Sequence, residues 1–232
     1  WVRLSDLMGT VGDQENSTIE TGDLTEEQVK EYKEKIEDLV SSNEENFAID
    51  LVRSINSPRL YEELLKDCSI DEEGNVDLRG WWEEEDGELS PFFLELVAHC
   101  PEEALLHSSL KRELITNLNV DRSYALTNVD GLSNLTNLEY LNLSNCYMLT
   151  NVDGLSNLSN LTELVLEDCE SLTNVDVLSN LTNLIELSLL SCESLTNVDV
   201  LSNLTNLTKL SLSRNSLTNV DVLSNLTNLT EL

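Results

Sequence analysis

The ten residues LTNVDGLSNL, which begin at Leu126, return four more times along the chain. An identical copy begins at Leu149, and copies reading LTNVDVLSNL begin at Leu172, Leu195 and Leu217. The steps between copies are 23, 23, 23 and 22 residues. A fixed period of this length is typical of a solenoid, in which each coil is one structural unit stacked on the next.

Within one unit, the spacing of the leucines changes. Leu155, Leu158 and Leu161 recur every third residue, which is typical of a 3₁₀ or short helical segment with one apolar edge. Leu164 and Leu166 are two residues apart, which is the period of a β-strand. Each unit is therefore predicted to contain a short strand, a turn and a tight helical return.

An aspartate stands just before each predicted helical segment, where an N-cap residue is expected. These residues are Asp130, Asp153, Asp176, Asp199 and Asp221. One unit carries too few aliphatic side chains to offset the conformational entropy lost when it becomes ordered. The units must therefore stack, and their strands are expected to line up as a parallel sheet.

Each complete repeat continues as LTNL or LSNL and then as LxxLxLxxC or, once, LxxLxLxxN. This pattern, kept over residues 115–232, resembles the leucine-rich-repeat family, most closely its bacterial, internalin-like repeats of 22 residues. The resemblance implies an α/β solenoid, a right-handed array with a parallel sheet on its concave face. About five units are expected, the last one incomplete.

Cysteines occupy one fixed position in three of the repeats. In the family this position is usually Asn, whose side chain ladders between coils; Asn215 fits, whereas Cys146, Cys169 and Cys192 replace it, and Ser123 replaces it in a degenerate first unit. We interpret the cysteines as a buried ladder of weak S–H donors. Strand spacing alone does not exclude a disulfide, but three thiols in a column cannot all pair. Free thiols favour a reducing compartment, so a cytoplasmic location is expected.

The first 114 residues contain no repeat. Residues 1–23 are predicted to be a polar linker or arm, and residues 24–114 a mainly helical, acidic region that caps the first coil. Thr25 and Gln28 have the spacing of a capping box. Helices are predicted from the apolar stripes over 29–40 and 47–55 and from the prolines at 58, 91 and 101, with a hairpin over 68–78.

Two aromatic residues and two histidines in this region allow alternatives. Trp81 and Trp82, which precede an acidic run, are interpreted as core anchors or as an exposed docking point. His99 and His107 are interpreted as surface or packing residues, because no Ser or Cys nucleophile motif accompanies them. There is no GxxxxGK[ST] or GxGxxG loop, and no CxxC pair. No catalytic residue, cofactor or metal is therefore expected.

The charge of the chain restricts its partners. Its 44 acidic and 13 basic residues give a net charge of −31, with −20 in residues 1–114 and −11 in residues 115–232. Nucleic-acid binding requires a basic face, and anionic lipid repels an acidic protein, so both roles are disfavoured. No run approaches the roughly 18 apolar residues of a membrane helix. A neutral or basic protein partner is expected.

The repeats differ from each other mainly at the outward strand positions and in the turn that follows. By resemblance, these side chains project from the concave sheet, which the family uses to bind partners. An alternative is neutral drift after recent duplication. The candidate contact residues are Tyr140, Asn142, Glu163, Val165, Glu167, Asp168, Glu186, Ser188, Leu190, Lys209, Ser211 and Arg214.

The predicted function is a non-catalytic protein-interaction module. Its central feature is the acidic patch formed by Glu163, Glu167, Asp168 and Glu186, which Lys209 and Arg214 are expected to flank. The alternative is a structural role in a larger assembly, in which the solenoid end packs on another chain. That alternative is motivated by the leucines that the sequence leaves uncovered where it stops in mid-repeat.

Overall fold

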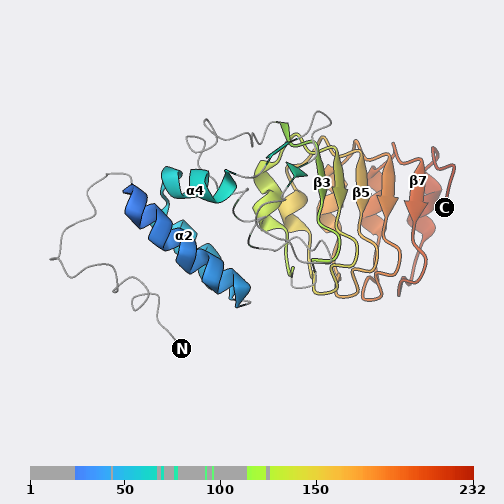
Figure 1. Ribbon diagram of the computed structural model, residues 1–232. Helices are drawn as coiled ribbons and strands as arrows, with labels where there is room; N and C mark the ends of the chain where they lie inside the picture. Colours follow the sequence, from blue (N-terminus) through green and yellow to red (C-terminus); the bar gives the residue numbers. More distant parts are fainter. Residues whose placement is uncertain are drawn as a thin grey trace.

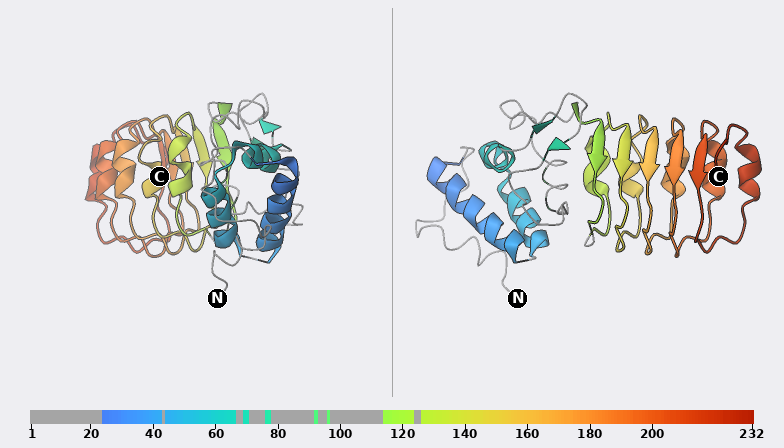
Figure 2. Two further views of the ribbon diagram at one scale, coloured as in Figure 1. Left: turned by 90° about the vertical axis from the view of Figure 1, so that its left-hand side faces the viewer. Right: turned by 45° about the vertical axis from the view of Figure 1, so that its right-hand side comes forward.

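The computed structural model describes residues 24–42, 44–66, 69–70, 76–77, 92, 96, 114–123 and 126–232. A group of α-helices forms the N-terminal part, and a solenoid of short strands and 3₁₀ helices forms the C-terminal part (Figure 1). The helices lie beyond the β3 end of the solenoid, and the coils then follow one another in sequence order toward the C-terminus (Figure 2).

Helix α2 (Glu26–Ser41) begins at the predicted capping box. The Thr25 N–H donates to the Gln28 side chain (2.9 Å), and the Gln28 N–H donates to the Thr25 hydroxyl (3.3 Å). These bonds satisfy two donors that a helix start otherwise leaves without partners. The buried residues of the helix, Val29, Ile36 and Val40, are spaced so that they share one face. The first predicted helix is confirmed.

Helices α3 (Glu45–Ile55) and α4 (Pro58–Leu65) confirm the next two predictions. Helix α3 ends at Asn56, whose φ of 48° is left-handed, and Ser57 then caps α4 by accepting from the Leu60 N–H. The apolar stripe of α4 is buried, whereas Phe47 in the predicted stripe of α3 is 44% exposed. Both α3 and α4 pack against α2.

The predicted hairpin is also present. Strands β1 (Ser69–Ile70) and β2 (Val76–Asp77) pair in antiparallel register, with Ile70 opposite Val76. The predicted arm over 1–23, the tryptophans at 81 and 82, and the histidines lie outside the described residues. So does most of the region predicted to cap the first coil, in which Phe92 and Leu96 are helical and buried.

The solenoid has two layers. Five strands form a parallel sheet in the order β3-β4-β5-β6-β7, and 3₁₀ helices line the opposite side (Figure 2). The strands are β3 (Asn117–Asn119), β4 (Tyr140–Asn142), β5 (Glu163–Val165), β6 (Glu186–Ser188) and β7 (Lys209–Ser211). The 3₁₀ helices are η2 (Asp130–Asn134), η3 (Asp153–Leu155), η4 (Asp176–Asn180), η5 (Asp199–Asn203) and η6 (Asp221–Asn225). A further coil starts at Glu231, which bridges to Lys209.

Leucine columns fill the space between the two layers. Leu141 and Leu164 of neighbouring strands pair directly, and both are fully buried, as are Leu158 and Leu161 behind them. The spacing of three residues therefore marks the 3₁₀ side, and the spacing of two marks the strand, as predicted. The predicted α/β solenoid is confirmed.

The aspartates do not act as N-caps, so that prediction is wrong. Asp153 is the first residue of η3, its N-cap position is Val152, and no side chain at that position bonds the helix. The Asp153 N–H donates instead to the side-chain oxygen of Asn151 (3.2 Å), which closes a local Asx turn. Equivalent asparagines, Asn128, Asn174, Asn197 and Asn219, hold the other four aspartate N–H groups at 2.7–3.1 Å.

The predicted thiol ladder is present. Cys146, Cys169 and Cys192 are free and fully buried, and each S–H donates to a backbone carbonyl of the preceding coil. The S···O distances are 3.5, 3.3 and 3.0 Å to Val120, Leu143 and Leu166. Each thiol thus satisfies a carbonyl inside the core, which would otherwise cost free energy to bury.

Asn215 differs from the cysteines that share its position. Its side-chain N–H donates to Leu212 of its own coil (2.9 Å), so it does not ladder to the coil before. An asparagine ladder runs instead along the loops after the 3₁₀ helices, where each amide donates to a carbonyl of the preceding coil at 2.8–2.9 Å. The ladder residues are Asn160, Asn183, Asn206 and Asn228.

Gly154 is required by the close approach of two coils. A Cβ at this position would collide with the backbone carbonyl of Val129 in the preceding coil. We expect Gly154→Val to lower the free energy of unfolding by about 1–3 kcal/mol, the usual range for overpacking. The result is informative because valine already occupies the equivalent positions Val177, Val200 and Val222. Urea denaturation measures the change, and a Gly154→Val variant as stable as the parent would contradict it.

The thiol ladder predicts an alkaline loss of stability. Burial raises the pKa of Cys146 and Cys192 to about 12 and also raises that of Cys169. Since the unfolded pKa is about 8.5, the stabilisation is complete below that pH and is lost as the pH rises toward 12. The slope is about 1.4 kcal/mol per pH unit for each thiol.

Replacing all three cysteines by alanine is expected to flatten this slope between pH 8.5 and 11 in urea titrations, although the variant is less stable at neutral pH. Asn215→Ala is the matched control, because it changes the same repeat position without removing a titrating group. An unchanged slope in the cysteine variant would show that other groups cause the alkaline loss.

Candidate functional site

The outward side chains of the sheet stand in the predicted columns. Tyr140, Glu163, Glu186 and Lys209 are successive partners in the strand register. The next outward column contains Asn142, Val165, Ser188 and Ser211. Between these columns, the central leucine of each strand points inward and is buried. We call the surface formed by the two outward columns and the turn that follows them the sheet face.

The turn after each strand contains a residue in the left-handed region. Its φ is 65° at Arg122, 59° at Asn145, 54° at Asp168, 59° at Ser191 and 60° at Arg214. None of the five is glycine, although glycine adopts this conformation most easily. The sequence therefore carried little signal for this column, in which only Asn145 and Asp168 are of a type that often adopts positive φ.

Backbone bonding explains why this conformation recurs. The N–H of Asn145 donates to the carbonyl of Glu167 in the next coil (2.8 Å), and the N–H of Asp168 donates in the same way to Leu190 (2.9 Å). The left-handed turn thus extends the inter-coil ladder beyond the strands. It also fixes where the side chains of Asp168 and its neighbours leave the backbone.

Lys209 contacts the acidic patch directly. Its ammonium lies 2.7 Å from a carboxylate oxygen of Glu186, one strand away. The hydrogen bond and the charge of Glu186 raise the pKa of Lys209. Lys209 therefore does not simply flank the patch, as predicted from sequence, but partly neutralises one of its four members.

Glu163 lies between Tyr140 and Glu186 in the first column and is half-buried. Burial raises its pKa, and the neighbouring charge of Glu186 raises it further, against the opposing effect of Lys209. The pKa of Tyr140 is raised by burial and by the charges of Glu163, Asp121 and Glu167. The centre of the sheet face is therefore electronegative and would favour a positive group from a partner.

Glu167 and Asp168 complete the patch. A Glu167 oxygen accepts from the Ser188 hydroxyl at 2.8 Å, which restrains the carboxylate next to β6. Asp168 follows in the left-handed position and is half-buried. Arg214 is exposed and lies two coils farther along the same column, at roughly 10 Å for two strand spacings, so it flanks the patch from a distance.

A second polar cluster adjoins the patch and was missed from sequence. Asn145 donates to Asp121 (2.8 Å), and the Tyr147 hydroxyl donates to Asn145 (3.2 Å). Tyr147 and its neighbour Met148 are 37% and 55% exposed. The sequence did contain a signal for this cluster: Tyr-Met follows Cys146, whereas Glu-Ser follows each of the other two cysteines of the ladder.

The sheet face offers fixed carboxylates, hydroxyls and the half-buried aromatic ring of Tyr140. Such groups can bind cationic and hydrogen-bonding side chains. Among the described residues, no group of three or more His, Cys, Asp or Glu side chains is arranged to hold a metal ion. Within the same residues, no helix has the length and apolar character needed to cross a bilayer.

Comparisons with known proteins concern the repeats. Residues 119–232 match the family model for the BspA type leucine rich repeat region, in six copies. The comparison with curated proteins finds no match.

Three solved structures from Listeria monocytogenes are similar to part of the chain. Internalin InlF is 26% identical over 60% of this chain and 53% of its own, with a TM-score of 0.33. Internalin C2 is 19% identical over 60% and 79%, with a TM-score of 0.33. The functional domain of InlJ, described as including a cysteine ladder, is 22% identical over 52% and 34%, with a TM-score of 0.34.

The chain thus spans about half of the length of the InlF structure. The matched range, residues 119–232, contains β4 to β7, the 3₁₀ helices and most of the buried leucine columns described above. The repeat region of this chain, residues 119–232, belongs to the leucine-rich-repeat family.

Proposed function

We propose that this chain is a non-catalytic protein-interaction module that binds a partner on its sheet face. Leucine-rich-repeat proteins generally mediate protein–protein interaction, which supports the general class. The observation that carries the specific proposal is the contrast between the coil interior and the sheet face. The interior repeats the same buried leucines, whereas the sheet face changes from Tyr140 to Glu163 and Lys209 along one column.

The expected partner is a protein with a neutral or basic surface. Glu163 lies on β5, and Glu167 and Asp168 lie in the turn that follows it in the same coil. The ion pair between Glu186 and Lys209 leaves these three carboxylates as the main negative part of the patch. A lysine or arginine of the partner could form charge-assisted hydrogen bonds with them, and such bonds are stronger than neutral ones. The chain's net charge of −31 would speed the approach of a basic partner.

We also propose that the chain works in a reducing compartment such as the cytoplasm. The support is the column of three buried cysteines, whose thiols are all free. A disulfide between two of them would leave the third unpaired, and free thiols are typical of reducing compartments.

The test removes three negative charges without changing the shape of the sheet face. The triple variant Glu163→Gln, Glu167→Gln and Asp168→Asn keeps every side chain nearly isosteric, and asparagine tolerates the left-handed backbone at position 168. We expect it to lose partner capture from native extract, or to bind an identified partner about tenfold more weakly or worse, as loss of charge-assisted bonds predicts.

The matched control removes three exposed charges from the 3₁₀ side. Asp153→Asn, Asp176→Asn and Asp199→Asn change the net charge equally and should leave capture unchanged. Thermal unfolding of both variants checks that the solenoid is intact. Equal capture by the parent and the sheet-face variant would refute binding on this face. Sedimentation of the chain alone would reveal self-association, the outcome expected for a structural assembly role.

A further inference from the structure

The large apolar side chains of the sheet face lie on one diagonal. Tyr140 stands in the first outward column, and Val165 stands in the second column, one coil later. Leu190 follows one coil later again, two residues beyond Ser188, the register partner of Val165. Each step thus moves one coil along the solenoid and two residues along the strand direction. All three side chains are partly exposed, and we call them the apolar diagonal.

The other coils carry polar residues at these three outward positions. They are Asn117, Glu163, Glu186 and Lys209 at the first position, Asn119, Asn142, Ser188 and Ser211 at the second, and Asp121, Ser144, Glu167 and Ser213 at the third. The scaffold therefore accepts a polar residue at each position, so the apolar diagonal is not needed to fill the interior of the coils. An apolar centre with polar margins is the usual composition of a protein interface.

Carboxylates stand on both sides of the apolar diagonal. Glu163 is the register partner of Tyr140 and lies on the side of the later coils. Glu167 follows Val165 in the same coil and lies on the opposite side. The pKa of Tyr140 is raised by burial and then by the charges of Glu163 on one side and of Asp121 and Glu167 on the other. The diagonal thus runs between two acidic margins.

Part of this negative charge is left for a partner. The sheet face carries five acidic and three basic residues, of which Asp121 lies 3.6 Å from Arg122, and Glu186 lies 2.7 Å from Lys209. The remaining base is Arg214, at the far end of the diagonal. Three carboxylates form no ion pair with any residue that the structure describes, namely Glu163, Glu167 and Asp168.

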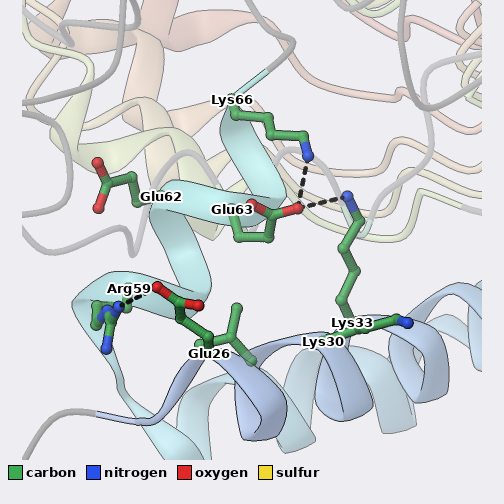
Figure 3. Close-up of a pocket in the computed structure, with 8 residues that line it drawn as sticks. Glu26, Lys30, Lys33, Arg59, Glu62, Glu63 and Lys66 are labelled. Atoms are coloured by element: carbon green, nitrogen blue, oxygen red, sulfur yellow. Dashed lines mark hydrogen bonds and ion pairs between the residues drawn. The ribbon is translucent and has the colours of Figure 1, made fainter.

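The cavity between α2 and α4 differs from the sheet face in this respect (Figure 3). Lys33 and Lys66 both contact Glu63, at 3.0 and 2.6 Å, and Arg59 lies 4.0 Å from Glu26. These basic residues are therefore already paired with carboxylates of the same two helices. The sheet face consequently offers a partner more uncompensated charge than this cavity does.

The dimensions of the apolar diagonal match one side of an α-helix. Neighbouring strands lie about 4.8 Å apart and two residues advance about 6.6 Å, so each step is about 8 Å and the diagonal is about 16 Å long. An α-helix rises about 1.5 Å per residue, so an apolar ridge at i, i+4, i+7 and i+11 spans roughly the same distance. Side chains on both flanks of such a ridge would meet the two acidic margins. An extended peptide points its side chains alternately toward and away from the sheet, so it would leave both margins without a partner.

We propose that the partner presents a basic amphipathic α-helix to the sheet face. Its apolar ridge would pack on Tyr140, Val165 and Leu190, and its lysine or arginine side chains would reach Glu163 and Glu167. This inference rests on the proposed function and names the structural element that the sheet face recognises. The argument for this occupant is charge complementarity on both margins together with the length of the apolar diagonal.

The first experiment measures peptide binding to the full chain by fluorescence anisotropy. The probe is a fluorescein-labelled peptide of about 15 residues, with leucines at i, i+4, i+7 and i+11 and lysines on both flanks. We expect saturable binding and a gain of helical circular dichroism on binding, since a free helix of this length is marginal in water. A scrambled peptide of the same composition has the same charge but no ridge, and it should bind at least tenfold more weakly.

The diagonal variant Tyr140→Asn, Val165→Ser and Leu190→Ser uses residues that other coils carry at the same positions, so the solenoid should remain folded. We expect it to bind the peptide at least tenfold more weakly, because the apolar contact is lost. The control variant Met148→Ser and Ile185→Thr removes apolar side chains that are 55% and 42% exposed outside the diagonal, and it should bind as the parent does. Thermal unfolding checks that both variants are folded.

Capture from native extract separates this inference from the proposed function. Loss of capture by the diagonal variant, together with loss by the sheet-face charge variant, supports both. Loss by the charge variant alone would overturn the apolar diagonal and leave binding on the sheet face intact. Capture retained by both variants would refute the proposed function itself.

Other outcomes would also overturn the inference. These are no binding of the amphipathic peptide, equal binding of the scrambled peptide, or equal weakening by the diagonal and control variants. Equal binding of a peptide with a central proline, which breaks the helix, would indicate an extended segment instead. Self-association that the diagonal variant abolishes, without peptide binding, would make a second copy of the chain the occupant.

Discussion

The structure depends on hydrogen bonds between successive coils. The strands are only three residues long, so no coil could hold its own backbone polar groups without neighbours. The ladder continues past each strand, where the N–H groups of Leu143 and Asn145 donate to Val165 and Glu167 of the next coil. Buried thiols and exposed asparagine amides add inter-coil bonds on other sides of the coil. Stability is therefore shared among coils and falls when any one coil is distorted.

This dependence on contacts between coils places different constraints on the buried residues and on the outward residues of the sheet face. A substitution at a buried leucine affects the stacking of two neighbouring coils, whereas the outward residues of the strands do not fill the space between the two layers. The column Tyr140, Glu163, Glu186 and Lys209 can consequently hold an aromatic ring, two carboxylates and an ammonium group in one register. In the left-handed turn, too, the backbone N–H makes the inter-coil bond, so the side chain can differ from one coil to the next.

Most of the fold could be predicted from the sequence because each repeat corresponds to one coil. Within a repeat, the spacing of the leucines distinguished the strand from the 3₁₀ helix. The N-cap rule failed at Asp153 because the 3₁₀ helix begins at Asp153 itself, so that Val152 occupies the N-cap position. The candidate site was less predictable, since the ion pair of Lys209 with Glu186 requires two particular rotamers on adjacent strands. Positive φ at Ser191 is imposed by the inter-coil ladder and not by its residue type. The ion pair of Lys33 with Glu63 requires α2 and α4 to lie side by side, and nothing in either helix alone indicates this packing.

Net charge is a poor guide to what the individual surfaces of this protein can bind. At physiological ionic strength the Debye length is about 8 Å, so distant charges on the −31 chain are largely screened at any one site. The local arrangement of charges then determines which kind of group each surface can bind. Three carboxylates around Glu167 favour a cation, whereas Lys33 and Lys66 both contact the carboxylate of Glu63 and favour its ionised form. The overall acidity affects how partners approach, and the local clusters determine which partner each surface can retain.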